Sequence, residues 1–172
     1  KGQIAAYLAK EYDVLVRVGG PNAGHSVKST SGKYVYHQLP SGCRDTQALV
    51  LLGPGAVLNP TAVLDEIREC GLGPDRVVID PQAMVISPED IEAERATVVG
   101  AISSTGTGTG RALARKILER GQSSRILARD YPELKPFIGD TFDRLETAFG
   151  RKQRVLLEGT QGSGLSLHHG SY

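Results

Sequence analysis

Residues 13–26, DVLVRVGGPNAGHS, join an apolar run to a glycine-rich loop. The run over residues 13–18 is rich in β-branched residues, which predicts a buried strand that ends at the pair Gly19-Gly20. The loop over residues 19–26 contains glycines and a small residue, so its backbone can approach a ligand closely and offer N–H and C=O groups to it. A strand followed by such a loop predicts a ligand site at the edge of a sheet.

Strands and helices alternate along the rest of the chain. Apolar runs at 49–52, 76–80 and 155–158 predict buried strands, and a further extended stretch is predicted at 34–39. The alternation predicts an α/β fold, a mainly parallel sheet with flanking helices, in a single domain over residues 1–172. The predicted helices cover residues 3–11, a segment from Asn59-Pro60 to Gly71, a segment that begins at Ser87-Pro88, residues 111–120 and residues 141–149.

The composition is that of a globular protein and excludes several classes of function. The 172 residues are 40% hydrophobic and 23% charged, with a formal net charge of +1. That charge gives no electrostatic reason to expect a nucleic acid or a membrane surface as a partner. Cys43 and Cys70 fit neither a metal-ligand spacing nor a secreted disulfide framework, so a reducing cytoplasmic location is expected.

In parallel sheets, ligands bind at the loops beyond the carboxyl ends of the strands. Three glycine-rich loops are candidates for such positions: 19–26, 103–110 and 159–164. The second loop combines hydroxyl groups with backbone N–H groups at a helix start, which favours a phosphate site. Its composition also fits a flexible linker, which the residues alone favour over the phosphate site. In the third loop, Gln161 stands between glycines and can present an amide to a ligand, although a plain turn has the same pattern.

Two side chains of the first loop can carry chemistry. His25 can hold or release a proton near neutral pH, and Asn22 can offer both a donor and an acceptor to a base or a phosphate. A histidine that caps a turn would produce the same spacing, so the pattern alone leaves both interpretations of His25 open.

The two ends of the sequence predict an incomplete domain. Lys1-Gly2 is too short to interpret on its own, but a lysine at the start of a helix is compatible with the last part of a phosphate-cradling loop. The last residues, Gly170-Ser171-Tyr172, follow a strand and a glycine-rich loop without a closing element. A small complete domain is the alternative.

Seven segments, in this order, carry a resemblance that covers essentially the whole chain. Together they resemble the adenylosuccinate synthetase family, and among its members the short archaeal-like or phage-like ones. For example, Lys1-Gly2 is similar to the end of the family's Gly-Asp-Glu-Gly-Lys-Gly loop, and residues 22–26 match its Asn-Ala-Gly-His-Thr/Ser signature. The remaining segments are 37–42, 52–57, 104–110, 158–162 and 169–172.

The resemblance implies a fold, an activity and partners. The fold would be a P-loop-NTPase-like α/β sheet, and the enzyme a homodimer that works in purine biosynthesis. The activity would be the GTP-dependent ligation of IMP and L-aspartate to adenylosuccinate through a 6-phosphoryl-IMP intermediate. GTP is a co-substrate, Mg²⁺ gathers the phosphate charge, and an acid stabilises the transferring group.

The resemblance also implies site residues at matching positions. His25 would be the catalytic acid, and the backbone carbonyl of Gly24 would ligate Mg²⁺. The GTP side would comprise Lys1, Gly2, Gln3, Gly24, His25 and Ser26. The IMP side would comprise Asn22, Ala23, Gly24, His25, Thr105 and Gln161.

This sequence departs from the family pattern, and one departure bears on the substrate. The family's catalytic Asp lies three residues before the Lys that Lys1 matches, so its position falls before the first residue of this sequence. The family's guanine-recognition and aspartate-binding segments would follow Tyr172. Phage-like relatives carry Ser at the Asp position and ligate dGMP with aspartate, so that activity stays an alternative. Gln3 stands where Lys is common. A non-catalytic purine-nucleotide-binding fragment is a further alternative, and the 172 residues alone are expected to be inactive.

Overall fold

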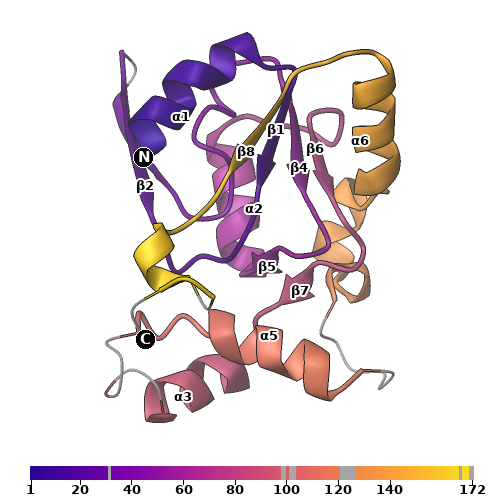
Figure 1. Cartoon of the computed structure of the whole chain (residues 1–172). Helices are drawn as coiled ribbons and strands as arrows, with labels where there is room; N and C mark the ends of the chain where they lie inside the picture. Colours follow the sequence, from indigo (N-terminus) through magenta and orange to yellow (C-terminus); the bar gives the residue numbers. More distant parts are fainter. Residues whose placement is uncertain (31, 98–99, 101–103, 121–126, 167, 171–172) are drawn as a thin grey trace.

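The computed structural model describes every residue except 31, 98–99, 101–103, 121–126, 167 and 171–172. Its centre is a four-stranded sheet in the order β6-β4-β1-β8, and all neighbouring strands are parallel (Figure 1). The predicted α/β fold with a mainly parallel sheet is therefore confirmed. The strands are β1 (Val14–Arg17), β4 (Leu49–Leu52), β6 (Val77–Ile79) and β8 (Val155–Glu158).

Side chains alternate between the two faces of the sheet, and a helix covers each face. Val50 and Leu52 of β4 belong to the core cluster that contains Val63 of α2 (Pro60–Glu69). Leu51 instead belongs to the cluster that contains Ala148 of α6 (Thr141–Gly150). Because successive residues of a strand point to opposite faces, a continuous apolar run is required here.

A second layer lies below the carboxyl edge of the sheet in Figure 1. It consists of the packed helices α3 (Pro88–Thr97) and α5 (Thr109–Leu118), next to the short parallel pair β5 (Val57–Leu58) and β7 (Met84–Val85). The remaining elements are α1 (Gly2–Leu8) and the 3₁₀ turns η1 (Ala9–Glu11), η2 (Ala128–Asp130), η3 (Pro132–Phe137) and η4 (Ser163–Leu165).

Local capping explains where two predicted helices begin. The side chain of Asn59 accepts a hydrogen bond from the backbone N–H of Ala62 at 3.0 Å, as expected of an N-cap before a proline. At the start of α3, Ser87 and Asp90 exchange hydrogen bonds: the Ser87 N–H donates to Asp90 Oδ2, and the Asp90 N–H donates to Ser87 Oγ.

The region after the first glycine loop differs from the prediction. The strands β2 (His25–Ser29) and β3 (Gly32–Tyr36) pair as an antiparallel hairpin, where we predicted a loop as far as Ser26 and an extended stretch at 34–39. Buried and exposed residues alternate in β2, which is the signature of a half-buried strand. The glycines just before β2 concealed that signature.

The segment from His37 to Cys43 follows the hairpin without regular structure, yet it is fixed in place. The carboxylate of Glu66 on α2 accepts hydrogen bonds from the backbone N–H groups of His37, Gln38 and Leu39 at 2.7, 3.1 and 2.8 Å. A buried carboxylate thus replaces the strand partner that these amides lack.

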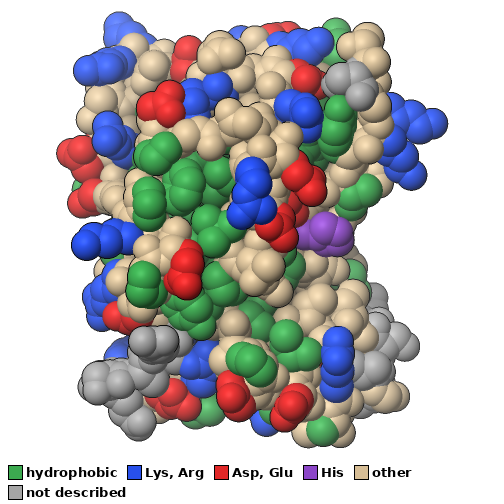
Figure 2. All heavy atoms as spheres, turned by 180° about the vertical axis from the view of Figure 1, so that it is seen from behind, with side chains coloured by type: hydrophobic (Ala, Val, Ile, Leu, Met, Phe, Trp, Pro, Cys, Tyr) green, Lys and Arg blue, Asp and Glu red, His purple; other side chains and the backbone are tan. Residues whose placement is uncertain are grey.

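The face opposite the view of Figure 1 carries hydrophobic side chains across its middle, interspersed with charged ones (Figure 2). Within the described residues, no helix is long and apolar enough to cross a membrane.

Candidate functional site

The three predicted loops meet at Gly19 and Gly20, directly after β1. Gly19 adopts a φ of 93°, and a Cβ on it would lie 2.6 Å from the hydroxyl of Thr160 in the third loop. A Cβ on Gly20 would lie 2.5 Å from the methyl group of Thr109, where the second loop enters α5. Both positions therefore require glycine, because the other two loops press against the backbone there.

The second loop is ordered by Glu94 of α3 rather than free. Glu94 Oε1 accepts from the Ser104 hydroxyl at 2.7 Å, and Oε2 accepts from the Gly110 N–H at 3.1 Å. The flexible-linker interpretation is therefore wrong for residues 104–110, while Ser103 lies outside the described residues. A carboxylate already uses an amide at the start of α5, which disfavours a phosphate at that amide.

Arg17 and Glu158 form a buried ion pair at the ends of β1 and β8. The two residues are register partners in the parallel sheet, with side chains only 2% and 3% exposed. Arg17 Nη1 donates to Glu158 Oε1 at 3.0 Å, and Arg17 Nη2 donates to the carbonyl of Ala23 at 3.0 Å. Burial lowers the pKa of Arg17, and the negative charge of Glu158 acts against that lowering.

His25, the predicted catalytic acid, is the first residue of β2 and is buried. Its Nδ1 contacts Glu158 Oε1 and lies 3.0 Å from Arg17 Nη1. Its Nε2 lies 2.9 Å from the carbonyl oxygen of Thr160. Both ring nitrogens thus face oxygen acceptors of the segment from Glu158 to Thr160, so a protonated ring can donate to both.

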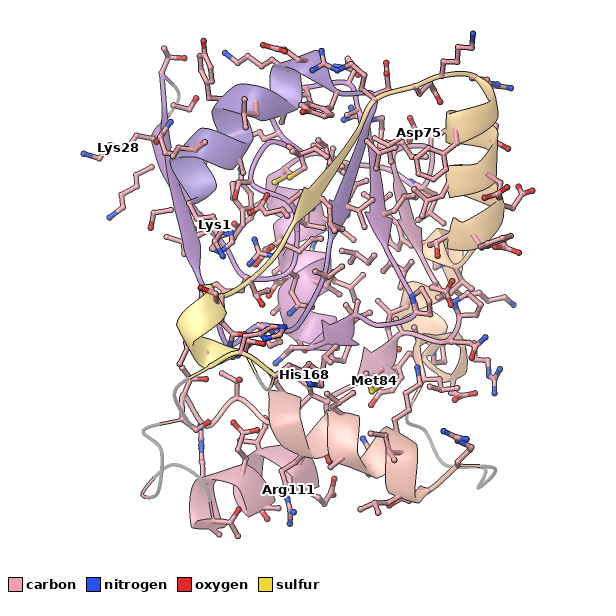
Figure 3. The ribbon with its side chains drawn as sticks, viewed as in Figure 1. Lys1, Lys28, Asp75, Met84, Arg111 and His168 are labelled. Carbon is pink, nitrogen blue, oxygen red and sulfur yellow. The ribbon has the colours of Figure 1, made fainter. Side chains whose placement is uncertain are left out.

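Lys1 reaches the same segment from the start of α1. Its ammonium group donates to the carbonyl of Gly159 at 3.2 Å and to the carbonyl of Gln161. Figure 3 shows Lys1 between α1 and the chain that leaves β8. The carbonyls of three successive residues, 159–161, therefore accept from Lys1 and His25. Both side chains are donors that suit phosphate oxygens as well.

The other residues predicted for the GTP side lie along α1 and β2. Gly2 packs against the backbone of His25 and Ser26, since a Cβ there would lie 3.1 Å from the carbonyl carbon of His25 and 3.0 Å from the carbonyl oxygen of Ser26. The side-chain amide of Gln3 exchanges two hydrogen bonds with the backbone of Lys28 at 2.8 and 3.2 Å. Ser26 is exposed. Gln3 is thus directed to the backbone of β2, whereas Gly2 lies against the site.

The residues predicted for IMP are partly brought together. Asn22 and Ala23 are half-buried and Gly24 is exposed in the first loop, while Gln161 is exposed in the third. Thr105 is exposed, and its hydroxyl lies 3.3 Å from that of Thr107. The Thr107 hydroxyl lies 3.1 Å from that of Thr109, which contacts Gly20, so a row of threonines joins Thr105 to the first loop.

Sequence reasoning missed Arg17, Glu158 and Ser41 as site residues. Ser41 donates to Glu158 from both its backbone N–H, at 2.8 Å, and its hydroxyl, at 2.6 Å. A signal was available in the sequence, because one charge interrupts or ends each of two otherwise apolar strands, and the charges have opposite signs. A charge at the end of a buried strand predicts a partner on the neighbouring strand.

A family model described as Adenylosuccinate synthetase matches residues 1–131 of the chain. The chain belongs to the adenylosuccinate synthetase family. The adenylosuccinate synthetases of Thermococcus onnurineus and Archaeoglobus fulgidus are 37% and 36% identical to it. Each alignment covers 100% of this chain but only 52% and 51% of the relative. The chain therefore spans about half the length of the curated relatives it matches.

Two solved structures of related proteins share the fold. Cyanophage S-2L succinoaminodeoxyadenylate synthetase (PurZ), bound to dGMP and dATP as an energy donor, superimposes with a TM-score of 0.81 at 29% identity, over 99% of this chain and 50% of that one. Fully ligated adenylosuccinate synthetase from Plasmodium falciparum gives a TM-score of 0.84 at 21% identity, over 100% and 51%. These likenesses confirm the P-loop-NTPase-like α/β fold expected of an adenylosuccinate synthetase.

Proposed function

We propose that the protein containing this chain is an adenylosuccinate synthetase that ligates IMP and L-aspartate at the expense of GTP. The observation that carries the proposal is the meeting of three loops at Gly19 and Gly20, with Lys1 and His25 directed at the residues 159–161. This arrangement supplies two donors for phosphate oxygens beside an exposed glutamine amide, Gln161.

The reaction has two steps, and the residues of this chain serve the first. The γ-phosphoryl group of GTP passes to the 6-oxygen of IMP, and the aspartate amine then displaces phosphate at C6. Lys1 and His25 stabilise the charge on the transferring group, with His25 as the acid. Asn22, Ala23, Thr105 and Gln161 hold IMP, while Gly2, Gln3 and residues 24–26 line the GTP side.

Magnesium fits this chain as a metal that is shared with the nucleotide. The described residues contain no group of three or more His, Cys, Asp or Glu that could hold a metal ion. Gly24 is exposed and offers a backbone carbonyl, the hard oxygen donor that Mg²⁺ takes, with phosphates and water as further ligands. The bound ion would neutralise phosphate charge during transfer.

A second candidate function is the ligation of dGMP with aspartate. The observation that favours it is the likeness to the cyanophage enzyme bound to dGMP, at 29% identity and a TM-score of 0.81. Both reactions place an amine at C6 of a purine, so the same loops serve either substrate.

The assembly and the location of the enzyme are part of the proposal. We place it in the cytoplasm as a homodimer, with IMP, GTP and L-aspartate as partners. The two cysteines support a reducing compartment, since Cys43 and Cys70 are free thiols although their sulfur atoms lie 3.9 Å apart.

The test uses the protein expressed from its full coding sequence. Purified enzyme is incubated with GTP, Mg²⁺, aspartate and either IMP or dGMP, and the succinylated nucleotide and phosphate are quantified by chromatography. Turnover with IMP is the expected result. Turnover with dGMP alone would transfer the proposal to the second candidate. Nucleotide binding without turnover in either mixture would contradict both and leave a binding protein.

Substitutions test the assigned residues in the same assay. His25→Ala is expected to lower kcat by about 100-fold or more, since it removes the acid of phosphoryl transfer. Lys1→Ala is expected to raise the KM for GTP. Lys33→Ala, which removes an exposed lysine of β3 outside the site, is the matched control and leaves both constants unchanged. Normal turnover of His25→Ala would contradict the catalytic assignment.

A further inference from the structure

The carboxylate of Glu158 is fully engaged, although nothing in the proposed reaction steps uses it. Oε1 accepts from Arg17 Nη1, the Ser41 hydroxyl and His25 Nδ1, and Oε2 accepts from the Ser41 N–H. Donors on three different segments thus fix both the position and the plane of this carboxylate. A buried charge held this completely is costly to desolvate, so a role beyond stability is expected.

The geometry around His25 indicates what that role is. With Nδ1 committed to Glu158, the ring cannot rotate without breaking a buried, charge-assisted contact. Nε2 is then the ring nitrogen directed at the glycine loops, where it meets the carbonyl of Thr160 at 2.9 Å. A carboxylate that holds one ring nitrogen of a histidine sets the direction of the other.

Arg17 completes the arrangement from the other side of the loop. Its Nη1 donates to Glu158, and its Nη2 donates to the carbonyl of Ala23 at 3.0 Å. Ala23 lies two residues before His25, so one guanidinium group fixes both the carboxylate and the backbone that carries the histidine. The planar guanidinium suits this double contact, which a lysine could not make in the same geometry.

We infer that Glu158, with Arg17 as its charge partner, is a positioning residue that fixes the ring of His25 so that Nε2 faces the phosphoryl group. The inference rests on the proposed function, in which His25 stabilises the transferring group. Glu158 does not touch substrate itself. Its effect on the reaction passes through His25, which makes the two residues a single unit in kinetic terms.

The decisive experiment is a double-mutant cycle on the full-length enzyme. Glu158→Gln keeps the size of the side chain but removes its charge, and is expected to lower kcat about 10- to 100-fold. The KM values for IMP and GTP should change by less than about threefold, because the variant removes an interaction that acts on the transition state. Combined with His25→Ala, Glu158→Gln should lower kcat no further than His25→Ala alone.

Two further variants keep the test decisive if Glu158→Gln does not fold. Ser41→Ala keeps the ion pair and removes one hydrogen bond to Glu158, so a smaller loss of kcat is expected that also vanishes in the His25→Ala background. Asp90→Asn is the matched control, because it disrupts an arginine–carboxylate pair outside the site and should leave kcat unchanged.

The outcomes separate this inference from the proposed function. The positioning role alone would be overturned if Glu158→Gln had the same kcat as the wild-type enzyme. It would also be overturned if the double variant lost kcat by the product of the two single losses, because the two residues would then act independently. Losses confined to KM would overturn it too. Absence of wild-type turnover with both IMP and dGMP would overturn the proposed function and this inference together.

Discussion

Two arginine–carboxylate pairs in this molecule, one buried and one partly exposed, differ in the direction in which their surroundings shift the pKa of the arginine. At the carboxyl edge of the sheet, burial lowers the pKa of Arg17 despite Glu158. In the helical layer, the hydrogen bond to Asp90 raises the pKa of Arg115. The side chains of the first pair are 2% and 3% exposed, whereas Arg115 is 19% exposed. Water thus still solvates Arg115, but not Arg17.

The difference indicates separate reasons for the two pairs. Asp90 receives two bonds from Arg115, at 3.0 and 2.7 Å, and joins α5 to α3 where an ion pair costs little to desolvate. Arg17 and Glu158 are removed from water, and their attraction does not fully offset that loss for the arginine. The Arg115–Asp90 pair is suited to holding a layer together, and the Arg17–Glu158 pair is suited to orienting His25.

The largest expected effect comes from breaking the buried pair at one member. Arg17→Met leaves Glu158 charged, buried and without its ionic partner, so the free energy of unfolding should fall by about 3–5 kcal/mol. Urea unfolding of the full-length protein, followed by circular dichroism, measures the loss. Arg129→Met removes an exposed arginine, whose side chain is 58% exposed, and should change almost nothing. A loss from Arg17→Met no larger than the control's would show that water reaches Glu158.

A smaller effect is expected from the pair in the helical layer. Asp90→Asn removes the charge that pairs with Arg115 and weakens the cap of α3, at a cost of about 1.5–3 kcal/mol. The loss should be smaller than that of Arg17→Met, because the partly exposed Arg115 can turn to water. The same urea unfolding measurement compares the two variants. A loss of stability for Asp90→Asn equal to or greater than that of Arg17→Met would contradict the prediction that the more buried pair contributes more.

The sequence predicted the strands of the parallel sheet better than the hairpin that follows its first strand. The strands at 49–52 and 155–158 and the helix start at Asn59-Pro60 are observed where they were predicted. The run at 49–52 is one that only a doubly covered strand can bury, and the helix start is a cap followed by proline. The run at 155–158 was predicted to be a buried strand, and this was wrong in part, because β8 lies at the edge of the sheet and leaves Leu157 64% exposed. The hairpin that begins at His25 was missed, because its alternation is short and follows glycines.

The site was predicted as three loops, but not as a network. Clustered glycines indicate where the backbone packs closely against another segment or a ligand, so the loops around Gly19 could be predicted from the sequence. The network around His25 could not be predicted, since the register of β1 with β8 is what places Glu158 beside Arg17, and Ser41 reaches Glu158 from the segment after the hairpin. Only tertiary structure brings such residues together.

Gln38 tests whether every polar group near the buried pair is satisfied. The residue is 3% exposed, and neither its amide nitrogen nor its amide oxygen has a partner within the described residues. Gln38→Met keeps the length of the side chain and removes this desolvated amide, so the protein should gain about 1 kcal/mol of stability. Thermal unfolding of the full-length protein measures the change.

The control for Gln38→Met is Gln47→Met, at an exposed glutamine that accepts from Arg76 at 3.0 Å. That variant should give no gain in melting temperature. A loss of stability in Gln38→Met would mean that the amide has a partner.

The smallest effect is expected from an ion pair of the same chemistry on the surface. Arg68 and Asp65 of α2 are 2.7 Å apart, but their side chains are 75% and 50% exposed. Asp65→Asn should therefore change the free energy of unfolding by less than about 0.5 kcal/mol, because water and salt already screen the charges. Urea unfolding at low and high salt measures it, and the small difference should shrink further at high salt. A loss approaching that of Asp90→Asn would mean that helix geometry, not burial, sets the strength of these pairs, and the contrast between Arg17 and Arg115 would then need another cause.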